Sequence, residues 1–329
     1  MLADKFSHIY IEENALSYPL AQKALYRFKN AVKVEIGHYK DVFCRPNQDF
    51  QLQKRAQNLI LAVKKDNFIY KGPELCQNFG NPNFYYTSSL LNCVYNCDYC
   101  YLQGMYPSAN LVAFVNIEDF FAAVLKQLNS QPLYLAVSYD TDLLAFENVI
   151  PFTAMWIEFA AGNPDLLIEI RTKSAGYSSI AGMSSVSNVI LAWTLSPDVI
   201  VEKYEKQTPA LSSRLSSIKQ AIADGWKVRL CFDPVIKAEG WKKIYEELVD
   251  EVFLSLPPDK IYDVGIGPFR MSADYLKRIR KSRYDSDLIY YPFECRNGIA
   301  GYAEEAEKEL VTHVYSCVNK YINRERIYL

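Results

Sequence analysis

The chain has 329 residues, half of them hydrophobic, and a formal net charge of -2. This length allows one large domain or two unequal ones, and the balanced charge excludes a general attraction to nucleic acid, so any such binding must rest on a local patch. The start, MLADKFSHIYIEENAL, carries acidic residues where a signal peptide would be apolar, and no apolar run reaches the roughly 20 residues of a membrane span. We expect a cytoplasmic monomer with no membrane association.

Residues 1–82 are predicted to form a small N-terminal α/β lobe. Within it, two short apolar runs, Asn58–Val63 and Phe68–Tyr70, are separated by KKDN and predict a hairpin. The stretch Pro73–Pro82 is rich in Gly, Pro and Asn, which is typical of a loop. We therefore place a domain boundary at residue 82 and predict a second domain over residues 83–329.

From residue 83 onward, apolar runs of β-rich composition alternate with segments of helical period, such as Ile117–Leu128. This alternation is typical of a parallel sheet with crossover helices. The six strand candidates are Phe84–Ser88, Leu133–Tyr139, Leu166–Thr172, Val189–Leu195, Lys227–Phe232 and Tyr262–Ile266. We predict an α/β fold, a partial (β/α)6 barrel similar to a TIM barrel, with its chemistry at the carboxyl ends of the strands.

The end of the chain is predicted to form a β-hairpin followed by a helix. Within Ile289–Tyr302, the turn-prone pair Asn297-Gly298 lies between a Tyr/Phe-rich flank and an apolar one. A helix over Ala303–Tyr321 is expected to follow.

Three of the eight cysteines crowd into the segment LLNCVYNCDYCYLQGMY. Cys93, Cys97 and Cys100 have the spacing C-x3-C-x2-C, and three thiolates this close suit a [4Fe–4S] cluster in which one iron stays open. The alternative is a structural zinc site, which needs a fourth ligand. No His or Cys follows within the next hundred residues, and the three histidines are remote in sequence. The spacing therefore favours an iron-sulfur cluster.

This motif, with Tyr99 directly before the last cysteine, resembles the signature of the radical S-adenosylmethionine superfamily. More of the chain resembles the spore photoproduct lyase family, through the stretches HYKDVFCRPNQ, CDYCYLQGMY, VAFVNIEDFF, SYDTD, IEIRTKS, TLSPDV and GWKVRLCFDPVI. The resemblance implies that the reduced cluster cleaves S-adenosylmethionine to a 5'-deoxyadenosyl radical. It also implies a DNA-repair lyase that reverts the thymine dimer called spore photoproduct to two thymines, in the interior of a spore or germinating cell.

The same resemblance implies roles for particular residues at the strand ends and beside the cluster. Ser138, Asp140, Asp142, Lys173 and Ser196 match positions at which the family binds its cofactor. Tyr99 and Tyr101, on either side of Cys100, match a tyrosine pair that relays a hydrogen atom. The alternatives are solvation for Lys173, helix capping for Ser196 and the two acids, and packing for the tyrosines.

One departure from the family concerns the residue that returns hydrogen to the product. The usual member has a cysteine at the position of Tyr139. We propose Cys76 as the replacement donor, if its loop folds over the barrel mouth, with Cys44 as the weaker alternative. Cys231 and Cys317 are expected to be core residues. Cys76 would otherwise pack as a small apolar residue.

A second departure concerns the segment that would contact DNA. The segment ECRNGIAGY resembles a family hairpin that enters damaged DNA with an Arg-Tyr pair, and here the pair is Arg296-Asn297. Tyr290, Tyr291, Phe293 or Tyr302 could supply the missing wedge. The nearby run YLKRIRKSRYDS is the most basic stretch, and we expect it to contact phosphates or simply to face solvent. Its cationic residues are Lys277, Arg278, Arg280, Lys281 and Arg283.

The leading hypothesis is thus a spore photoproduct lyase that uses a [4Fe–4S] cluster, S-adenosylmethionine and an electron donor such as flavodoxin or ferredoxin. One alternative is a radical enzyme with a different nucleic-acid or small-molecule substrate, which the Tyr139 and Asn297 departures keep open. Another is a noncatalytic DNA-binding protein whose cluster is structural. An open iron that binds S-adenosylmethionine discriminates against the last.

Overall fold

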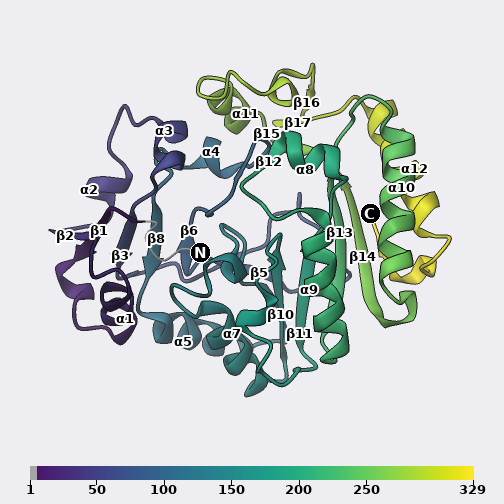
Figure 1. Ribbon diagram of the computed structural model, residues 1–329. Coiled ribbons are helices and arrows are strands. Elements are labelled where there is room, and N and C mark those ends of the chain that lie inside the picture. Colours follow the sequence, from purple (N-terminus) through teal and green to yellow (C-terminus); the bar gives the residue numbers. More distant parts are fainter. Residues whose placement is uncertain (1–5) are drawn as a thin grey trace.

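An eight-stranded sheet forms the larger part of the computed structural model, which describes residues 6–329 (Figure 1). All neighbouring strands are parallel except the outermost pair β4 and β5. In spatial order the strands are β18 (Ile327–Tyr328), β14 (Ile261–Pro268), β13 (Lys227–Val235), β11 (Val189–Thr194), β10 (Leu166–Thr172), β9 (Leu133–Ala136), β5 (Phe84–Thr87) and β4 (Ile69–Lys71). The six strands from β14 to β5 are the six predicted ones, so the partial barrel is confirmed.

Helices connect these strands and cover the outside of the sheet, as right-handed crossovers require. They are α5 (Ile117–Leu128), α6 (Leu143–Phe146), α7 (Phe152–Ala161), α8 (Asp198–Tyr204), α9 (Leu211–Ala223) and α10 (Trp241–Ser255). Figure 1 shows α9, α10 and α12 (Glu304–Val318) beside β13 and β14. No helix among residues 6–329 combines the length and the apolar character needed to cross a bilayer.

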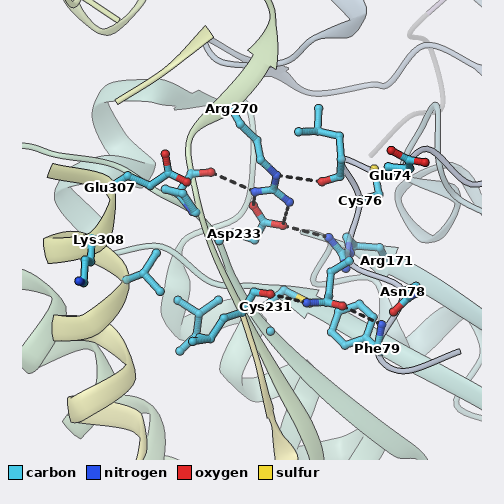
Figure 2. A pocket seen from close by; sticks show the side chains of 18 of the residues that line it. Glu74, Cys76, Asn78, Phe79, Arg171, Cys231, Asp233, Arg270, Glu307 and Lys308 are labelled. Atoms are coloured by element: carbon cyan, nitrogen blue, oxygen red, sulfur yellow. Dashed lines mark hydrogen bonds and ion pairs between the residues drawn. The ribbon is translucent and has the colours of Figure 1, made fainter. Parts of the chain in front are cut away.

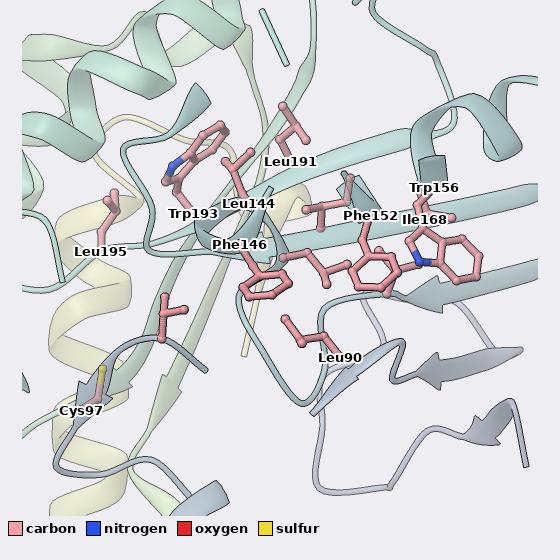
Figure 3. Close-up of a cluster of buried hydrophobic side chains, with 14 of the residues drawn as sticks. Leu90, Cys97, Leu144, Phe146, Phe152, Trp156, Ile168, Leu191, Trp193 and Leu195 are labelled. Carbon is pink, nitrogen blue, oxygen red and sulfur yellow. The ribbon is translucent and has the colours of Figure 1, made fainter. Parts of the chain in front are cut away.

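The core lies between the strands and these helices (Figure 3). All six residues of β11 are buried, because both faces of a parallel sheet are covered. Phe152 and Trp156 of α7 pack in the same cluster as Ile168 of β10. Cys97 belongs to this cluster too, so the cysteine motif is tied to the core rather than held on a free surface loop.

The N-terminal lobe contains a second sheet of five strands, at the left in Figure 1. Its order is β2 (Val32–Ile36), β1 (His8–Glu12), β3 (Leu59–Ala62), β8 (Leu111–Phe114) and β6 (Leu90–Leu91). The lobe's helices are α1 (Pro19–Arg27), α2 (Lys40–Phe43) and α3 (Phe50–Arg55).

The strand pairing in this lobe differs from the predicted one. The hairpin across KKDN is wrong, because β3 pairs with β1 and β8 while β4 pairs with β5 in the other sheet. The division at residue 82 stays a prediction, and the lobe's sheet takes β6 and β8 from beyond it. The buried strand β8 lies between β3, to which it is parallel, and β6, to which it is antiparallel.

The C-terminal part carries a three-stranded sheet of β15 (Arg270–Ser272), β17 (Ile299–Gly301) and β16 (Glu294–Arg296). Asn297 and Gly298 have φ values of 52° and 79°, which suit a tight turn between β16 and β17. The predicted hairpin and the helix after it, α12, are therefore confirmed. Between β15 and β16 lies α11 (Ala273–Ile279), which packs on α4 (Leu102–Met105).

Candidate active site at the mouth of the barrel

The three motif cysteines line one cavity of about 530 Å³. They lie on the segment between β6 and α4, and two residues of that segment, Asn96 and Cys97, form the short strand β7 against β12 (Glu205–Lys206). The opposite wall comes from the ends of β9, β10 and β11. It includes Ser138, Thr141, Asp142, Thr172, Lys173 and Thr194. Strand ends and cysteine motif therefore face one space of the size that binds a cofactor.

A buried lysine from the N-terminal lobe holds the first turn of the cysteine loop. The ammonium nitrogen of Lys54 donates to the carbonyl oxygens of Cys93 (2.6 Å) and Tyr95 (2.7 Å). Gln57 Nε2 also donates to the Cys93 carbonyl, at 3.0 Å. Burial lowers the pKa of Lys54. These donors satisfy carbonyl groups that the core would otherwise leave unpaired.

A buried arginine from the C-terminal part holds the second turn. Arg283 Nη1 lies 2.6 Å from Asp98 Oδ1, and its Nε donates to Gln103 Oε1 at 2.9 Å. Gln103 in turn donates to the Cys97 carbonyl at 2.8 Å. Only 1% of each side chain of the Arg283–Asp98 pair is exposed. Arg283 therefore belongs to the site's interior, although the sequence places it in a basic surface run.

Burial raises the pKa of all three cysteine thiols, that of Cys93 to about 11. Binding of iron must therefore displace a proton from each thiol. In the described part of the chain, no group of three or more His, Cys, Asp or Glu side chains could hold a single metal ion. A [4Fe–4S] cluster makes a different demand, because each cysteine binds a different iron.

The polar side chains of SYDTD are mostly occupied by protein partners. Ser138 Oγ bonds to the backbone oxygen and nitrogen of Arg171 at 2.9 and 2.7 Å. Asp140 accepts from Ser88 Oγ at 2.5 Å. Asp142 accepts from the backbone nitrogens of Ala145 (3.0 Å) and Lys173 (2.7 Å), so it caps α6. These contacts fix the loop at the cavity edge.

Two polar groups on the cavity wall are still available to a ligand. The buried Thr141 Oγ1 has no hydrogen-bond partner within residues 6–329. The Lys173 ammonium lies 5.4 Å from the centre of the Tyr99 ring. Burial alone would lower the pKa of Lys173, but Glu205 and the cysteines Cys97 and Cys100 raise it. A partly buried cation and a buried unpaired hydroxyl both favour a polar, anionic ligand in this cavity.

Glu205 organises the wall behind Tyr99. Its carboxylate accepts from the Tyr99 phenol and from Ser196 Oγ (2.8 Å) and forms a fully buried ion pair with Arg214 (2.5 Å). Burial would raise the pKa of Glu205, but Lys173 and Arg214 lower it, so the group is ionised. Sequence reasoning missed Glu205, since an acid after a short helix carries no distinguishing signal.

The second tyrosine of the motif, Tyr101, bonds to the loop after β9 rather than to Glu205. The Tyr101 phenol donates to the Tyr139 carbonyl at 2.8 Å and to Asp140 Oδ1 at 3.1 Å. Tyr99 and Tyr101 thus flank Cys100 but have separate partners. Burial raises the pKa of both phenols well above its usual range, so both stay protonated at physiological pH.

Cys76 lies on the wall of the same cavity, and its Sγ is 3.3 Å from the Tyr139 phenol oxygen. The Tyr139 ring stacks on Tyr86 with a centroid distance of 4.0 Å. The loop of Cys76 therefore reaches the barrel mouth. Cys44 is exposed at the end of α2, and Cys231 and Cys317 are buried core residues as expected.

Some of the residues predicted to contact DNA are exposed to solvent, whereas others donate hydrogen bonds to backbone carbonyls of the protein. Arg296 and Asn297 are exposed on the hairpin, although Arg296 also pairs with Glu307. Lys277 and Lys281 are exposed. Arg278 donates to the Gly104 carbonyl at 3.1 Å, and Arg280 donates to the Ile289 carbonyl at 2.8 Å. Of the four candidate wedges, Tyr302 is fully buried, whereas Tyr290 is 48% exposed.

Comparison with known proteins gives one consistent result. The sequence profile of the family described as spore photoproduct lyase matches residues 5–286. The spore photoproduct lyase of Clostridium acetobutylicum is 22% identical over 289 residues, which cover 85% of this chain and 83% of the relative. That of Bacillus subtilis is 23% identical over 266 residues, which cover 78% and 75%.

Solved structures agree on the fold. A spore photoproduct lyase complexed with dinucleoside spore photoproduct has a TM-score of 0.86 at 18% identity, covering 98% of this chain and 97% of its own. A mutant with bound AdoMet and dinucleoside spore photoproduct has a TM-score of 0.84, covering 99% and 98%. At this identity the likeness shows the shared fold.

Arg283→Met should lower the free energy of unfolding by about 3–5 kcal/mol, because it leaves Asp98 as a buried charge without its partner. Lys203→Met, which removes an exposed ion pair with Asp287, should cost less than about 1 kcal/mol. Urea denaturation of both variants measures the difference. Equal losses would contradict the assignment of Arg283 as a buried support of the cysteine loop.

Proposed function

Because the chain belongs to the spore photoproduct lyase family, we propose that it reverts spore photoproduct in DNA to two thymines with a [4Fe–4S] cluster and S-adenosylmethionine. The observation that supports this most is the cavity in which three cysteines face an available lysine and a hydroxyl without a protein partner. When bound, the cluster and S-adenosylmethionine supply a 5'-deoxyadenosyl radical that removes a hydrogen atom from the lesion. The protein orients the reacting groups and excludes competing reactions.

The residues of the cavity fit these groups. Cys93, Cys97 and Cys100 would hold the cluster. Lys173 would pair with the carboxylate of S-adenosylmethionine, and Thr141 would offer its hydroxyl. The first role gives the Lys173 ammonium a direct ion-pair partner in addition to the nearby charge of Glu205, and the second satisfies a buried hydroxyl that lacks a hydrogen-bond partner within residues 6–329.

The other predicted cofactor residues would act mainly by holding the wall in place. Ser138, Asp140 and Asp142 fix the loop that carries Thr141 through the bonds described above. Ser196 does the same for Tyr99 through Glu205. All four would therefore belong to the cofactor site in this supporting role.

Hydrogen return would begin at Cys76. Its S–H bond breaks and a C–H bond forms on the product radical, which leaves a thiyl radical on Cys76. The Tyr139 phenol, 3.3 Å away, can give a hydrogen atom back to that sulfur. Burial raises the pKa of Tyr139, so its hydroxyl keeps the hydrogen that this step needs. Tyr101, whose ring centroid is 6.1 Å from that of Tyr139, and then Tyr99 would carry the relay toward the cofactor.

Outside the cavity, the hairpin residues Arg296 and Asn297 would contact the lesion strand. Lys277 and Lys281 would contact phosphates with their exposed ammonium groups. Arg278 and Arg280 would add the guanidinium nitrogens that do not donate to backbone carbonyls. An electron donor such as flavodoxin or ferredoxin would reduce the cluster, and the enzyme would act as a monomer in the cytoplasm of the spore or germinating cell.

Anaerobic reconstitution tests the activity. Protein with its cluster is mixed with dithionite, S-adenosylmethionine and a spore photoproduct dinucleotide, and thymine is followed by chromatography. Thymine release is the expected result. Cofactor cleavage without thymine, on the dinucleotide and on duplex DNA with the lesion, would instead assign the radical chemistry to another substrate.

Cys76→Ala should still cleave the cofactor and open the lesion, but it should give abnormal, incompletely reduced thymine products. In deuterated water, unsubstituted protein should place deuterium in the released thymine, because the Cys76 thiol exchanges with solvent. Cys44→Ala, which removes an exposed cysteine of the N-terminal lobe, is the matched control and should leave the products unchanged. Ordinary products from Cys76→Ala would remove Cys76 from the mechanism.

A further inference from the structure

The loop that carries Cys76 is anchored on both sides of the cysteine. On one side, the Phe79 ring is buried against Arg229, whose guanidinium carbon lies 3.4 Å from the ring centroid. On the other side, Arg270 Nε donates to the Leu75 carbonyl at 3.2 Å. Cys76 follows Leu75 directly, so the second anchor controls where its thiol points.

Arg270 is itself fixed by a two-point ion pair. Its Nη1 and Nη2 lie 2.9 and 3.2 Å from the two carboxylate oxygens of Asp233, and Nη1 also donates to the Pro268 carbonyl at 3.0 Å. Figure 2 shows Asp233 between Arg270 and Arg171, with Cys76 nearby. With two nitrogens committed to Asp233, the planar guanidinium can aim its Nε only in one direction, toward Leu75.

Asp233 is anchored in turn through the barrel interior. Arg171 lies 3.6 Å from Asp233 and 3.1 Å from Glu169, and Glu169 lies 2.5 Å from Arg229. Arg229 pairs with Asp263 at 2.5 Å. Three acids and three arginines therefore alternate from β14 to the Cys76 loop. Each charge has an opposite charge as a neighbour, which makes the burial of Asp263, Arg229 and Glu169 tolerable. The partly buried Arg171 and Asp233 continue the arrangement and define the geometry of its last member, Arg270.

Strand β14 leaves room for both anchors by carrying two glycines on one face. A Cβ on Gly267 would lie 2.6 Å from Arg270 Nη1 and 3.0 Å from Asp233 Oδ1. A Cβ on Gly265 would lie 3.0 Å from the Phe79 ring. Residues two apart on a strand share a face. The two glycines of β14 therefore leave space for the two side chains that hold the loop, Arg270 beside Gly267 and Phe79 beside Gly265.

The ion pair also stands between two cavities. Figure 2 shows residues that line a second cavity, of about 750 Å³, and the walls of both cavities include Cys76, Arg171, Asp233 and Arg270. A loop released from Arg270 could therefore turn Cys76 away from the cysteine-lined cavity and into the second one. Holding the thiol on the correct side needs a specific contact, and the Arg270–Leu75 bond provides it.

We propose that Arg270 and Asp233 are positioning residues that hold Cys76 beside Tyr139, so that its thiol faces the product in the cysteine-lined cavity. This inference rests on the proposed function for its role in repair, but the placement of the thiol can be measured independently. Neither residue touches the reacting atoms. Their effect passes through the backbone of Leu75.

Alkylation of the reconstituted protein by iodoacetamide, followed by mass spectrometry, measures the placement. Arg270→Lys keeps the charge but lacks the planar fork, and Asp233→Asn keeps the shape but loses the charge. Both should raise the alkylation rate of Cys76 about tenfold, as expected for the loss of one charge-assisted hydrogen bond. The exposed Cys44 and Cys295 serve as internal standards, and their rates should not change.

Arg326→Lys is the matched control, because Arg326 also donates to a carbonyl, that of Ile261, at the opposite end of β14. It should leave the Cys76 rate unchanged. In the repair assay, Arg270→Lys should raise the share of abnormal products per cofactor cleaved toward that of Cys76→Ala.

Unchanged Cys76 alkylation in both Arg270→Lys and Asp233→Asn would overturn the proposal, whatever the catalytic result. Faster alkylation with wild-type products would overturn the role in hydrogen return. If unsubstituted protein releases no thymine, the proposed function fails on its own, and the alkylation rates still decide whether the ion pair holds Cys76.

Discussion

The cysteine loop can stay in the core only because side chains from distant parts of the chain satisfy its polar groups. Lys54 comes from the N-terminal lobe, and Arg283 comes from the segment after α11. Each brings a charge into the interior, which is costly unless it meets carbonyl oxygens or an acid there. The lobe and the C-terminal segment must therefore close around the loop together, and the barrel mouth takes its shape from that closure.

The same constraint operates inside the barrel. Burial alone would raise the pKa of Glu169, yet the flanking Arg171 and Arg229 lower it to about 2. Acidic and basic side chains that would each be unstable alone in the interior stabilise one another as an alternating row of ion pairs. This row ends at Arg270, which bonds to the loop of Cys76. The proposed transfer of hydrogen atoms between the Cys76 sulfur and tyrosine phenols requires short, fixed distances. A network of ion pairs, buried at Arg229 and partly buried at Arg270, supplies rigidity of that kind where the loop would otherwise be free.

Much of this architecture could be predicted because it is local in sequence. The six barrel strands are continuous apolar runs, and the Asn297-Gly298 turn has a specific backbone demand. The hairpin across KKDN failed because strand pairing is a long-range choice. Two neighbouring apolar runs can join different sheets.

The site was predictable in outline but not in its contacts. SYDTD marks a polar strand end, but nothing local shows that Ser138, Asp140 and Asp142 bond to protein while Thr141 does not. A run of basic residues likewise does not reveal which member turns inward, as Arg283 does. Glu205 joins Tyr99, Ser196 and Arg214 only in three dimensions.

The central claim is that S-adenosylmethionine binds an open iron beside Lys173. Electron paramagnetic resonance of the reduced, reconstituted protein tests it through the change that S-adenosylmethionine causes in the cluster signal. Lys173→Met should require about tenfold more S-adenosylmethionine for that change, the loss expected for one charge-assisted hydrogen bond. Lys227→Met removes a lysine that also lies over a tyrosine ring, but at the other end of the barrel, and should behave like wild type. A wild-type signal that does not respond to S-adenosylmethionine, or a Lys173→Met variant that responds as wild type does, would contradict the account.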